Sequence, residues 1–175
     1  TDDDYIDGTD AFVAVFNATG GLMWAHSFGS SGGITGLRDD VVWAVVFDEE
    51  GNLYAAGYTQ GELDLPPPYS QTKSNTNNIY DCFIVKYDSS GVLQWGVQFG
   101  TNQADEVYGI DYRFDESSNQ GVIAVTGYTL GDLYGTNAGD DDIFVALFSA
   151  SDGTQLVGKG VQIGSAGFDG GSSVK

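Results

Sequence analysis

Short apolar runs alternate with turn-forming residues along the whole chain. The runs are rich in β-branched and aromatic side chains and are bounded by Asp, Ser, Asn and Gly, a composition typical of strands. They occupy residues 11–16, 41–47, 53–58, 82–87, 107–114, 122–128 and 143–148. No stretch has the sustained 3.6-residue periodicity of an amphipathic helix. The pattern therefore predicts an all-β protein with little or no helix.

The runs belong to units that recur. The motif Gly-Tyr-Thr-x-Gly-x-Leu occurs at residues 57–63 and again at 127–133. A second unit consists of an Asp followed by a strand, a turn closed by Gly, and a strand that ends before Gly. Its copies lie at residues 10–29, 81–100 and 142–164, and at one common offset Trp24 aligns with Trp95 and Phe28 with Phe99. A period of tens of residues is typical of solenoids and propellers.

Each full period contains four strands. Residues 48–51 and 88–91 join strand pairs through a turn that begins with Asp and ends with Gly, because Asp caps its own turn and Gly adopts positive φ at little cost. We expect one repeat array over residues 1–175. Its predicted units are an outer half at 10–29, two whole units at 39–100 and 105–164, and the start of another at 168–175.

Several predicted strands are apolar on both faces. Residues 41–47 contain no polar position, whereas a strand with one face in water should alternate apolar and polar residues. Such a strand must be covered on both sides, which stacked four-stranded antiparallel sheets would achieve. Radial stacking of these sheets is the architecture of a β-propeller.

The ordered set of motifs resembles the SBBP type of β-propeller repeat over nearly the whole chain. The matching elements are the Asp-x-Phe strand at 81–87, the Asp-Ser-Ser-Gly turn at 88–91, the strand at 93–100 ending in Phe-Gly, Asp105-Glu106, the strand at 107–114, Gly-Tyr-Thr at 127–129, and Gly-Asn-Leu-Tyr at 51–54. The resemblance implies four-stranded blades with residues 41–47 or 107–114 as the innermost strand. It implies no single activity, because a fold does not determine a function.

About two and a half blades cannot close a ring, since propellers have four to eight. The leading expectation is that the chain is the ordered part of a longer protein. The alternatives are a protomer whose ends complete blades with neighbouring copies, and a stand-alone monomer. Partners are therefore expected to be copies of this chain or the remainder of a longer one.

Composition narrows the possible partners and location. Six basic and 25 acidic residues give a formal charge of −19, which disfavours nucleic acid and anionic membrane surfaces as partners. No apolar run is long enough for membrane insertion. We expect an extracellular or cell-surface location.

No catalytic constellation stands out. His26 is the only histidine and Cys82 the only cysteine, and both have a packing role as their simplest interpretation. Paired carboxylates could serve a glycoside hydrolase, but many acidic proteins contain such pairs. We therefore predict no catalytic residues and no enzyme activity.

Three modest site hypotheses remain. Asn17 heads the only N-glycosylation acceptor sequence and lies in a predicted turn. Acidic pairs at strand junctions could supply oxygen ligands to Ca²⁺, a hard cation; the candidates are Asp39, Asp40, Asp105 and Glu106. None has the spacing of a dedicated calcium loop. The recurrence of Asp39 and Asp105 at one position of the unit favours instead a structural role, in which the carboxyl groups bond loop amides. The proline cluster Pro66, Pro67 and Pro68, followed by Tyr69, predicts an extended polyproline II loop that could contact a partner.

These observations predict a non-enzymatic extracellular scaffold of propeller-type blades, in a surface or filamentous assembly. One alternative is a carbohydrate- or protein-binding propeller, which would present exposed Trp or Tyr side chains to glycans or partners. Another is a catalytic or non-catalytic piece of a larger secreted hydrolase.

Overall fold

The computed structural model describes residues 8–31, 38–65, 69–71 and 79–175. These residues form strands and no helix, which confirms the all-β prediction. The strands are β1 (Ala11–Phe16), β2 (Leu22–Phe28), β3 (Ser30–Ser31), β4 (Asp40–Phe47), β5 (Leu53–Thr59), β6 (Glu62–Leu63), β7 (Tyr69–Gln71), β8 (Asp81–Tyr87), β9 (Leu93–Phe99), β10 (Asp105–Asp115), β11 (Gln120–Thr129), β12 (Asp142–Ser149) and β13 (Gln155–Ile163). In this part of the chain, no helix could cross a membrane.

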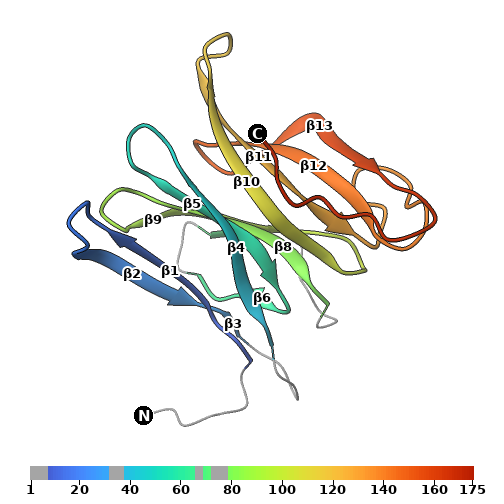
Figure 1. Cartoon of the computed structure of the whole chain (residues 1–175), viewed down its shortest axis with the longest axis horizontal. Coiled ribbons are helices and arrows are strands. Elements are labelled where there is room, and N and C mark those ends of the chain that lie inside the picture. The colour runs from blue at the N-terminus through green and yellow to red at the C-terminus, as the bar shows by residue number, and fades with distance from the viewer. Residues whose placement is uncertain (1–7, 32–37, 66–68, 72–78) are drawn as a thin grey trace.

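Three main sheets lie side by side (Figure 1). The half sheet is β1–β2, the middle sheet runs β4-β5-β8-β9, and the last sheet runs β10-β11-β12-β13. All strand pairs named in these three orders are antiparallel. The predicted antiparallel four-stranded sheets are therefore confirmed. A further short pair, β3–β6, joins residues near the end of the half sheet to those after β5.

The middle sheet has one strand that the sequence did not predict. β7 adds to its outer edge and runs parallel to β9, with Tyr69 opposite Gly96. The residues directly after the prolines, Tyr69–Gln71, are therefore paired in a sheet. The exposed edge of β9 offers unpaired backbone groups, and a short strand satisfies them.

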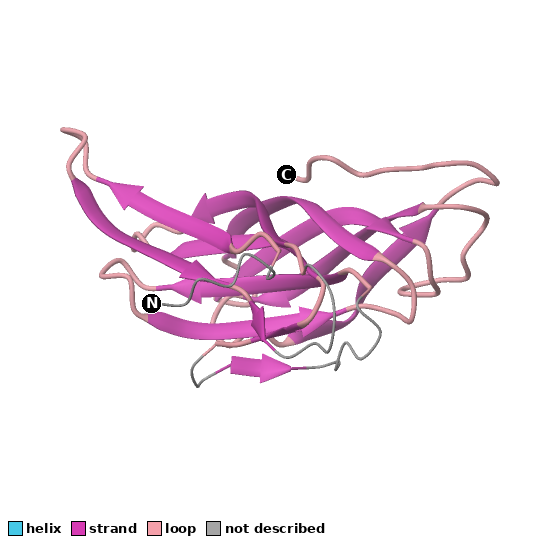
Figure 2. Cartoon of the chain, turned by 90° about the horizontal axis from the view of Figure 1, so that it is seen from below, coloured by secondary structure: helices cyan, strands magenta, loops and turns pink. Residues whose placement is uncertain are grey.

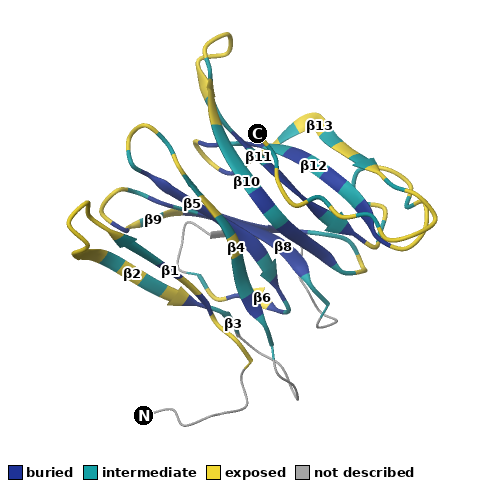
Figure 3. Cartoon of the chain, viewed as in Figure 1, coloured by how far each residue is buried: buried dark blue, intermediate teal, exposed yellow. Residues whose placement is uncertain are grey.

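The middle sheet is buried on both faces. One apolar cluster joins it to the half sheet and includes Phe83, Val85 and Leu53. A second cluster joins it to the last sheet and includes Ile84 and Tyr54. Successive side chains of a strand point to opposite faces, so β5 and β8 contribute alternate residues to the two clusters. Figure 3 shows this continuous burial along both strands, and Figure 2 shows the strands of the molecule from below.

β4 departs from the sequence prediction. Trp43, Val45 and Phe47 are 52%, 51% and 48% exposed, so the expectation that residues 41–47 would be covered on both sides was wrong. β4 is the free edge of its sheet. The half sheet contains two strands, which pack on the outer part of the middle sheet and leave Val45 and Phe47 open. Trp43 lies at the register shift of β4 and its ring is beside Tyr108 of β10.

The repeated tryptophans tie each sheet to the turn of the next. The indole Nε1 of Trp24 donates to the Ser89 carbonyl at 3.3 Å, and that of Trp95 donates to the Ala150 carbonyl at 3.2 Å. The following turn glycines, Gly91 and Gly153, have φ of 87° and 74°. A Cβ at either glycine would lie 2.7 Å from the indole ring. The common offset of the two tryptophans in the sequence thus corresponds to one repeated contact between sheets.

Candidate functional site

An aspartate recurs at each junction between successive sheets. Its Oδ2 accepts two hydrogen bonds from one serine or threonine, from the backbone N–H and from the side-chain hydroxyl. The pairs are Asp40 with Ser30, Asp105 with Thr101, and Asp169 with Ser165. Asp169 lies in the predicted start of a further unit, residues 168–175, which contains no strand.

The backbone contacts of these aspartates recur as well. The backbone N–H of each aspartate donates to the carbonyl of a residue that lies just before β1, β8 or β12. The bonds are Asp40 to Thr9 at 2.7 Å, Asp105 to Tyr80 at 2.9 Å and Asp169 to Asp141 at 2.9 Å. The same backbone bond therefore recurs at the two junctions between sheets and at a third place after the last sheet.

A second aspartate meets the first at the middle junction. A Cβ at Gly100 would lie 2.6 Å from Oδ1 of Asp81 and 2.8 Å from Oδ2 of Asp105. The two carboxyl groups thus converge on the glycine that ends the Phe-Gly motif. Both aspartates are fully buried. Glycine is required here because any side chain would displace a buried carboxyl group.

Burial raises the pKa of Asp105 above its ordinary value, and the nearby charge of Asp81 adds to that rise, against the hydrogen bonds from Thr101. The pKa of Asp40 is raised in the same way, chiefly by burial, with a contribution from Asp10. Oδ1 of each of these two residues is buried without a hydrogen-bond partner. An ionised buried oxygen without a partner is costly, so burial at the junctions disfavours the ionised form of these two carboxyl groups.

Replacing Asp105 with asparagine should flatten the pH dependence of stability. A pKa that is raised on folding means that the folded state binds the proton more tightly than the unfolded state does. The stabilisation that this proton binding provides is lost as pH rises from about 3.9 through the folded-state pKa. Asparagine stays neutral and its Oδ1 can still accept from Thr101. We expect Asp105→Asn to be at least as stable as the wild type at pH 7, measured by urea denaturation between pH 4 and 8.

Asp105→Ala is the matched control. It removes the acceptor for the Thr101 amide and hydroxyl, and should cost about 1–3 kcal/mol at every pH in this range. If the asparagine variant lost as much stability at pH 7 as the alanine variant, the ionised carboxylate would be the stabilising form, contrary to the argument from burial.

The Gly-Tyr-Thr motif serves the same junctions. Thr59 Oγ1 lies 3.2 Å from the carbonyl oxygen and from the amide of Gly61, and Thr129 bonds Gly131 in the same manner. Gln98 adds a bond of 2.9 Å to the Gly61 carbonyl and one of 3.1 Å to Asp81. The motif thus organises the loop at the end of its strand.

The four calcium candidates lie at two separate junctions. Asp40 and Asp105 begin β4 and β10, each with the Ser or Thr partner described above. Asp39 accepts from the Thr9 amide at 3.1 Å. Within the described ranges, no group of three or more His, Cys, Asp or Glu side chains could hold a metal ion. Calcium remains a prediction without a matching cluster in this part of the chain.

Glu106 is held by two tyrosines. Its carboxylate accepts from the Tyr108 hydroxyl at 2.9 Å and from the Tyr128 hydroxyl at 2.6 Å. Burial is the largest cause of the raised pKa of both phenols, and the bond to Glu106 also contributes. Glu106 is itself buried. Its oxygens are therefore engaged within the protein.

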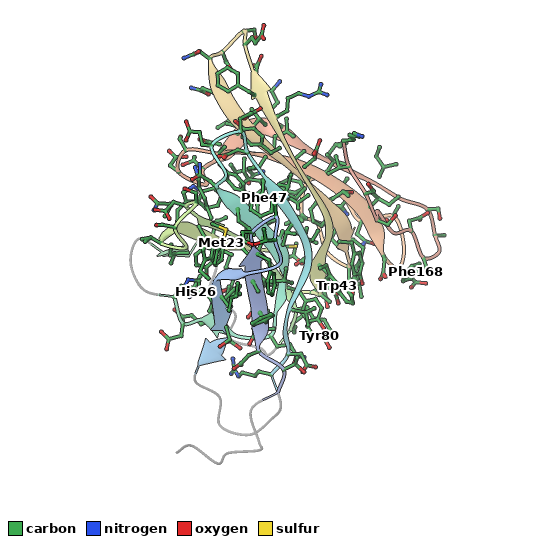
Figure 4. The ribbon with its side chains drawn as sticks, turned by 60° about the vertical axis from the view of Figure 1, so that its left-hand side comes forward. Met23, His26, Trp43, Phe47, Tyr80 and Phe168 are labelled. Carbon is green, nitrogen blue, oxygen red and sulfur yellow. The ribbon has the colours of Figure 1, made fainter. Side chains whose placement is uncertain are left out.

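These tyrosines belong to a row of aromatic rings, the aromatic row, which comprises Trp43, Tyr58, Tyr80, Tyr108, Tyr128 and Phe168. Neighbouring centroids in the row lie 4.6–6.5 Å apart. Figure 4 labels Trp43 on β4, with Tyr80 and Phe168 towards the same side of the molecule. Trp43 is the most accessible tryptophan whose exposure the structure describes. The row can offer apolar ring surface to a ligand.

Asn17 has a turn-capping role. Its Oδ1 accepts from the Thr19 amide at 3.0 Å, the Thr19 hydroxyl at 2.7 Å and the Gly21 amide at 2.8 Å. Asp88 caps the equivalent turn through Ser90 and Val92. The residue is exposed, and its glycosylation stays a prediction.

Some of the remaining candidates pack against other residues, and others lie outside the described part of the chain. Pro66, Pro67 and Pro68 lie outside the described residues, and Tyr69 begins β7. Cys82 is fully buried. The His26 ring stacks on Tyr87 with centroids 5.0 Å apart, and its Nε2 lies 2.7 Å from the Gly91 carbonyl oxygen.

Sequence reasoning missed the polar partners of the junction aspartates. A signal for them was present, because a Ser or Thr directly follows the glycine at positions 30, 101 and 165. Gln98 and Gln162 recur at equivalent positions and make equivalent bonds. The aromatic row had a partial signal, because Tyr58 and Tyr128 recur in the Gly-Tyr-Thr motif, whereas its other members come from different strands and loops.

No family model matches the chain. It is 26% identical over 149 residues to the regulatory protein FlaEY of Caulobacter vibrioides. The match covers 83% of this chain and 14% of that protein. The similarity therefore extends over more than one of the units found in the sequence, and the chain spans about a seventh of the length of this relative.

Proposed function

We propose that this chain is a run of β-propeller-type blades that serves as a non-enzymatic structural and interaction scaffold. The observation that carries the proposal is the middle sheet, whose β5 and β8 are buried on both faces by sheets of related sequence. A repeat of this kind cannot bury its apolar faces alone and depends on its neighbours.

The two outermost faces present the same kind of surface, and no sheet among the described residues covers either of them. The C-terminal segment touches one of them, since a Cβ at Gly171 would lie 2.9 Å from Cγ2 of Ile143. The N-terminal end face is the outer side of β1–β2 and comprises Phe12, Ala14, Phe16, Met23 and Ala25. The C-terminal end face is the outer side of β12–β13 and comprises Ile143, Val145, Leu147, Val161 and Ile163. In this proposal each end face receives a further blade, from the remainder of a longer chain or from another copy.

Equivalent positions inside the molecule support this role for the end faces. Phe12 is 62% exposed, whereas Phe83 at the equivalent position of β8 is fully buried against the half sheet. Ile163 is 67% exposed, whereas its equivalent Phe99 is buried against the last sheet. The end faces therefore carry at their surface residues that elsewhere in the chain form the cores between sheets.

The buried carboxyl groups favour a scaffold over a hydrolase. A glycoside hydrolase needs two carboxyl groups that reach its substrate, and Asp81 and Asp105 are shielded from solvent. The acidic composition would keep such an assembly soluble. The proposed location is extracellular or at the cell surface, where the exposed turn at Asn17 would be open to glycosylation.

Sedimentation velocity tests the proposal on the 175-residue chain. We expect concentration-dependent association, reduced by Phe12→Lys and by Ile163→Lys, because each places a charge on an end face. Both side chains are exposed, so circular dichroism should show an unchanged fold. A wild-type chain that stays monomeric up to its solubility limit would contradict the proposal.

A carbohydrate- or protein-binding role is the second candidate. The aromatic row favours it, because Trp43 exposes about half of its surface beside Tyr108 and Tyr58, and aromatic side chains supply large contact area in binding sites. Two of the five polar groups of the row, the hydroxyls of Tyr108 and Tyr128, already donate to Glu106, which reduces their capacity to bond a sugar.

A further inference from the structure

β1 has a partner on one side. It pairs with β2, and the described residues provide no strand along its other edge. The equivalent strands β8 and β12 are paired on both sides, with β5 and β11 as their inner neighbours. The free edge of β1 therefore presents backbone N–H and C=O groups whose equivalents in the other two sheets are hydrogen-bonded to a neighbouring strand.

A second uncovered surface lies beside this edge. Val45 and Phe47 of β4 are about half exposed. Their equivalents in β10 are Ile110 and Tyr112, because Val45 pairs with Ala55 as Ile110 pairs with Val125. Ile110 and Tyr112 pack against the core between the middle and last sheets. The Tyr112 ring stacks on Tyr54 of β5 with centroids 5.8 Å apart.

The segment that leads into β1 nevertheless bonds to β4 through the same kind of backbone hydrogen bond that joins the segment before β8 to β10. The Asp40 amide donates to Thr9 at 2.7 Å, as the Asp105 amide donates to Tyr80 at 2.9 Å. Relative to β4, β1 thus starts where β8 starts relative to β10. Asp10, in contrast, is exposed, whereas Asp81 and Asp142 at the equivalent positions are buried. Among the described residues, no strand covers the position next to β1, over β4.

We propose that the free edge of β1 and the exposed side of β4 at Val45 and Phe47 together form an acceptor site for a two-stranded β-hairpin of the β4–β5 type, supplied by a partner chain built of the same repeat. The inference rests on the proposed function, because it assumes that repeats of this kind associate. The docked hairpin would cover β4 in the way that β4 and β5 cover β10 at the interface between the middle and last sheets.

The register of the incoming hairpin follows from the existing ladders. Thr59 pairs with Asp81, Tyr58 with Cys82 and Gly57 with Phe83, and β11 meets β12 in the same register. A docked strand would accordingly place Thr opposite Asp10, Tyr opposite Ala11 and Gly opposite Phe12. Glycine is needed in the incoming strand because a Cβ there would overlap the carbonyl group of its own hairpin partner, as at Gly57.

The backbone of β1 would supply hydrogen bonds to the hairpin, which is the mode of peptide recognition called β-augmentation. The exposed side chains of Val45 and Phe47 would supply apolar contact. Main-chain pairing gives affinity without sequence preference, and side chains at alternate positions give specificity. The acceptor site should therefore select hairpins that carry the Gly-Tyr-Thr motif.

A fluorescein-labelled peptide of residues 38–65 of this chain is the probe, and binding to the 175-residue protein is followed by fluorescence anisotropy. We expect saturable binding that unlabelled peptide competes away and that a scrambled peptide does not. Amide hydrogen exchange in residues 11–16 should slow when the peptide binds. The peptide variant Gly57→Val should bind at least about tenfold more weakly, because the register cannot form.

Protein variants locate the site. Val45→Lys should weaken binding by about tenfold or more, while Phe114→Lys, at a residue of similar exposure on β10, should leave it within about twofold. Both wild-type positions are solvent-accessible, so both variants should fold. Equal binding by the two variants, or unchanged exchange in residues 11–16, would overturn the proposal. If Phe12→Lys abolished self-association but the wild-type protein bound no peptide, the acceptor site would be wrong while the proposed scaffold function would stand.

Discussion

Alanine at Gly127 should destabilise the protein by about 3 kcal/mol or more. A Cβ at this position would overlap the carbonyl oxygen of Glu106 and lie 2.8 Å from its carbonyl carbon. The clash is with backbone, which cannot rotate away as the end of a side chain can. A register shift between Val107 and Gly109 creates this close approach on the opposite strand. Chemical denaturation at neutral pH measures the effect.

Gly57 provides an internal repeat of the same experiment. A Cβ there would overlap the Val41 carbonyl, next to the equivalent register shift in β4. We expect Gly57→Ala to cost a similar amount. Gly167→Ala is the control, because nothing lies within 4 Å of a Cβ at that position. If all three variants had the stability of the wild type, the motif glycines would have no steric role.

Truncation of Trp95 should have the second large effect. Trp95→Ala is expected to cost about 3–5 kcal/mol, because the side chain is buried in the core between the middle and last sheets. Its ring lies 5.9 Å from Tyr54, centroid to centroid. Its N–H reaches the Ala150 carbonyl in the turn of the next sheet. The variant would therefore lose both apolar contact and a tie between sheets.

Two further variants separate these contributions. Trp95→Phe keeps most of the ring and should cost about 1–2 kcal/mol, since the Ala150 carbonyl still accepts from Lys86 Nζ at 3.0 Å. Trp43→Ala removes an exposed tryptophan and should cost less than about 1 kcal/mol. Far-ultraviolet circular dichroism should follow unfolding, because the substitutions alter the fluorescence. A loss at Trp43 equal to that at Trp95 would contradict the assignment of the core.

Much of the fold could be predicted from local features. The turns at Asp88 and Asp48 follow from side chains that bond their own backbone, and the paired strands follow from apolar runs between such turns. The repetition of Trp24 and Trp95 indicated a repeated environment, although the contact itself, an indole over the turn of the next sheet, depends on how the sheets are offset.

The candidate site was predicted less well, for a physical reason. Adjacent residues in a strand point to opposite faces, so neighbouring positions such as Asp39 and Asp40, or Asp105 and Glu106, do not by themselves bring two carboxyl groups to one place. The carboxyl groups that do meet, Asp81 and Asp105, come from different sheets and converge on Gly100. Distance along the chain conceals such a pair until the sheets are placed against each other.

By itself, the sequence determined the strand content, the turn positions and the repetition, because periodicity, β-branching and turn chemistry act over a few residues. Only the tertiary structure decided which faces are covered, that β7 joins β9, that one side of β4 is left open, and that two aspartates share a buried junction. These features depend on the stacking of sheets, and stacking brings together residues that no local pattern connects.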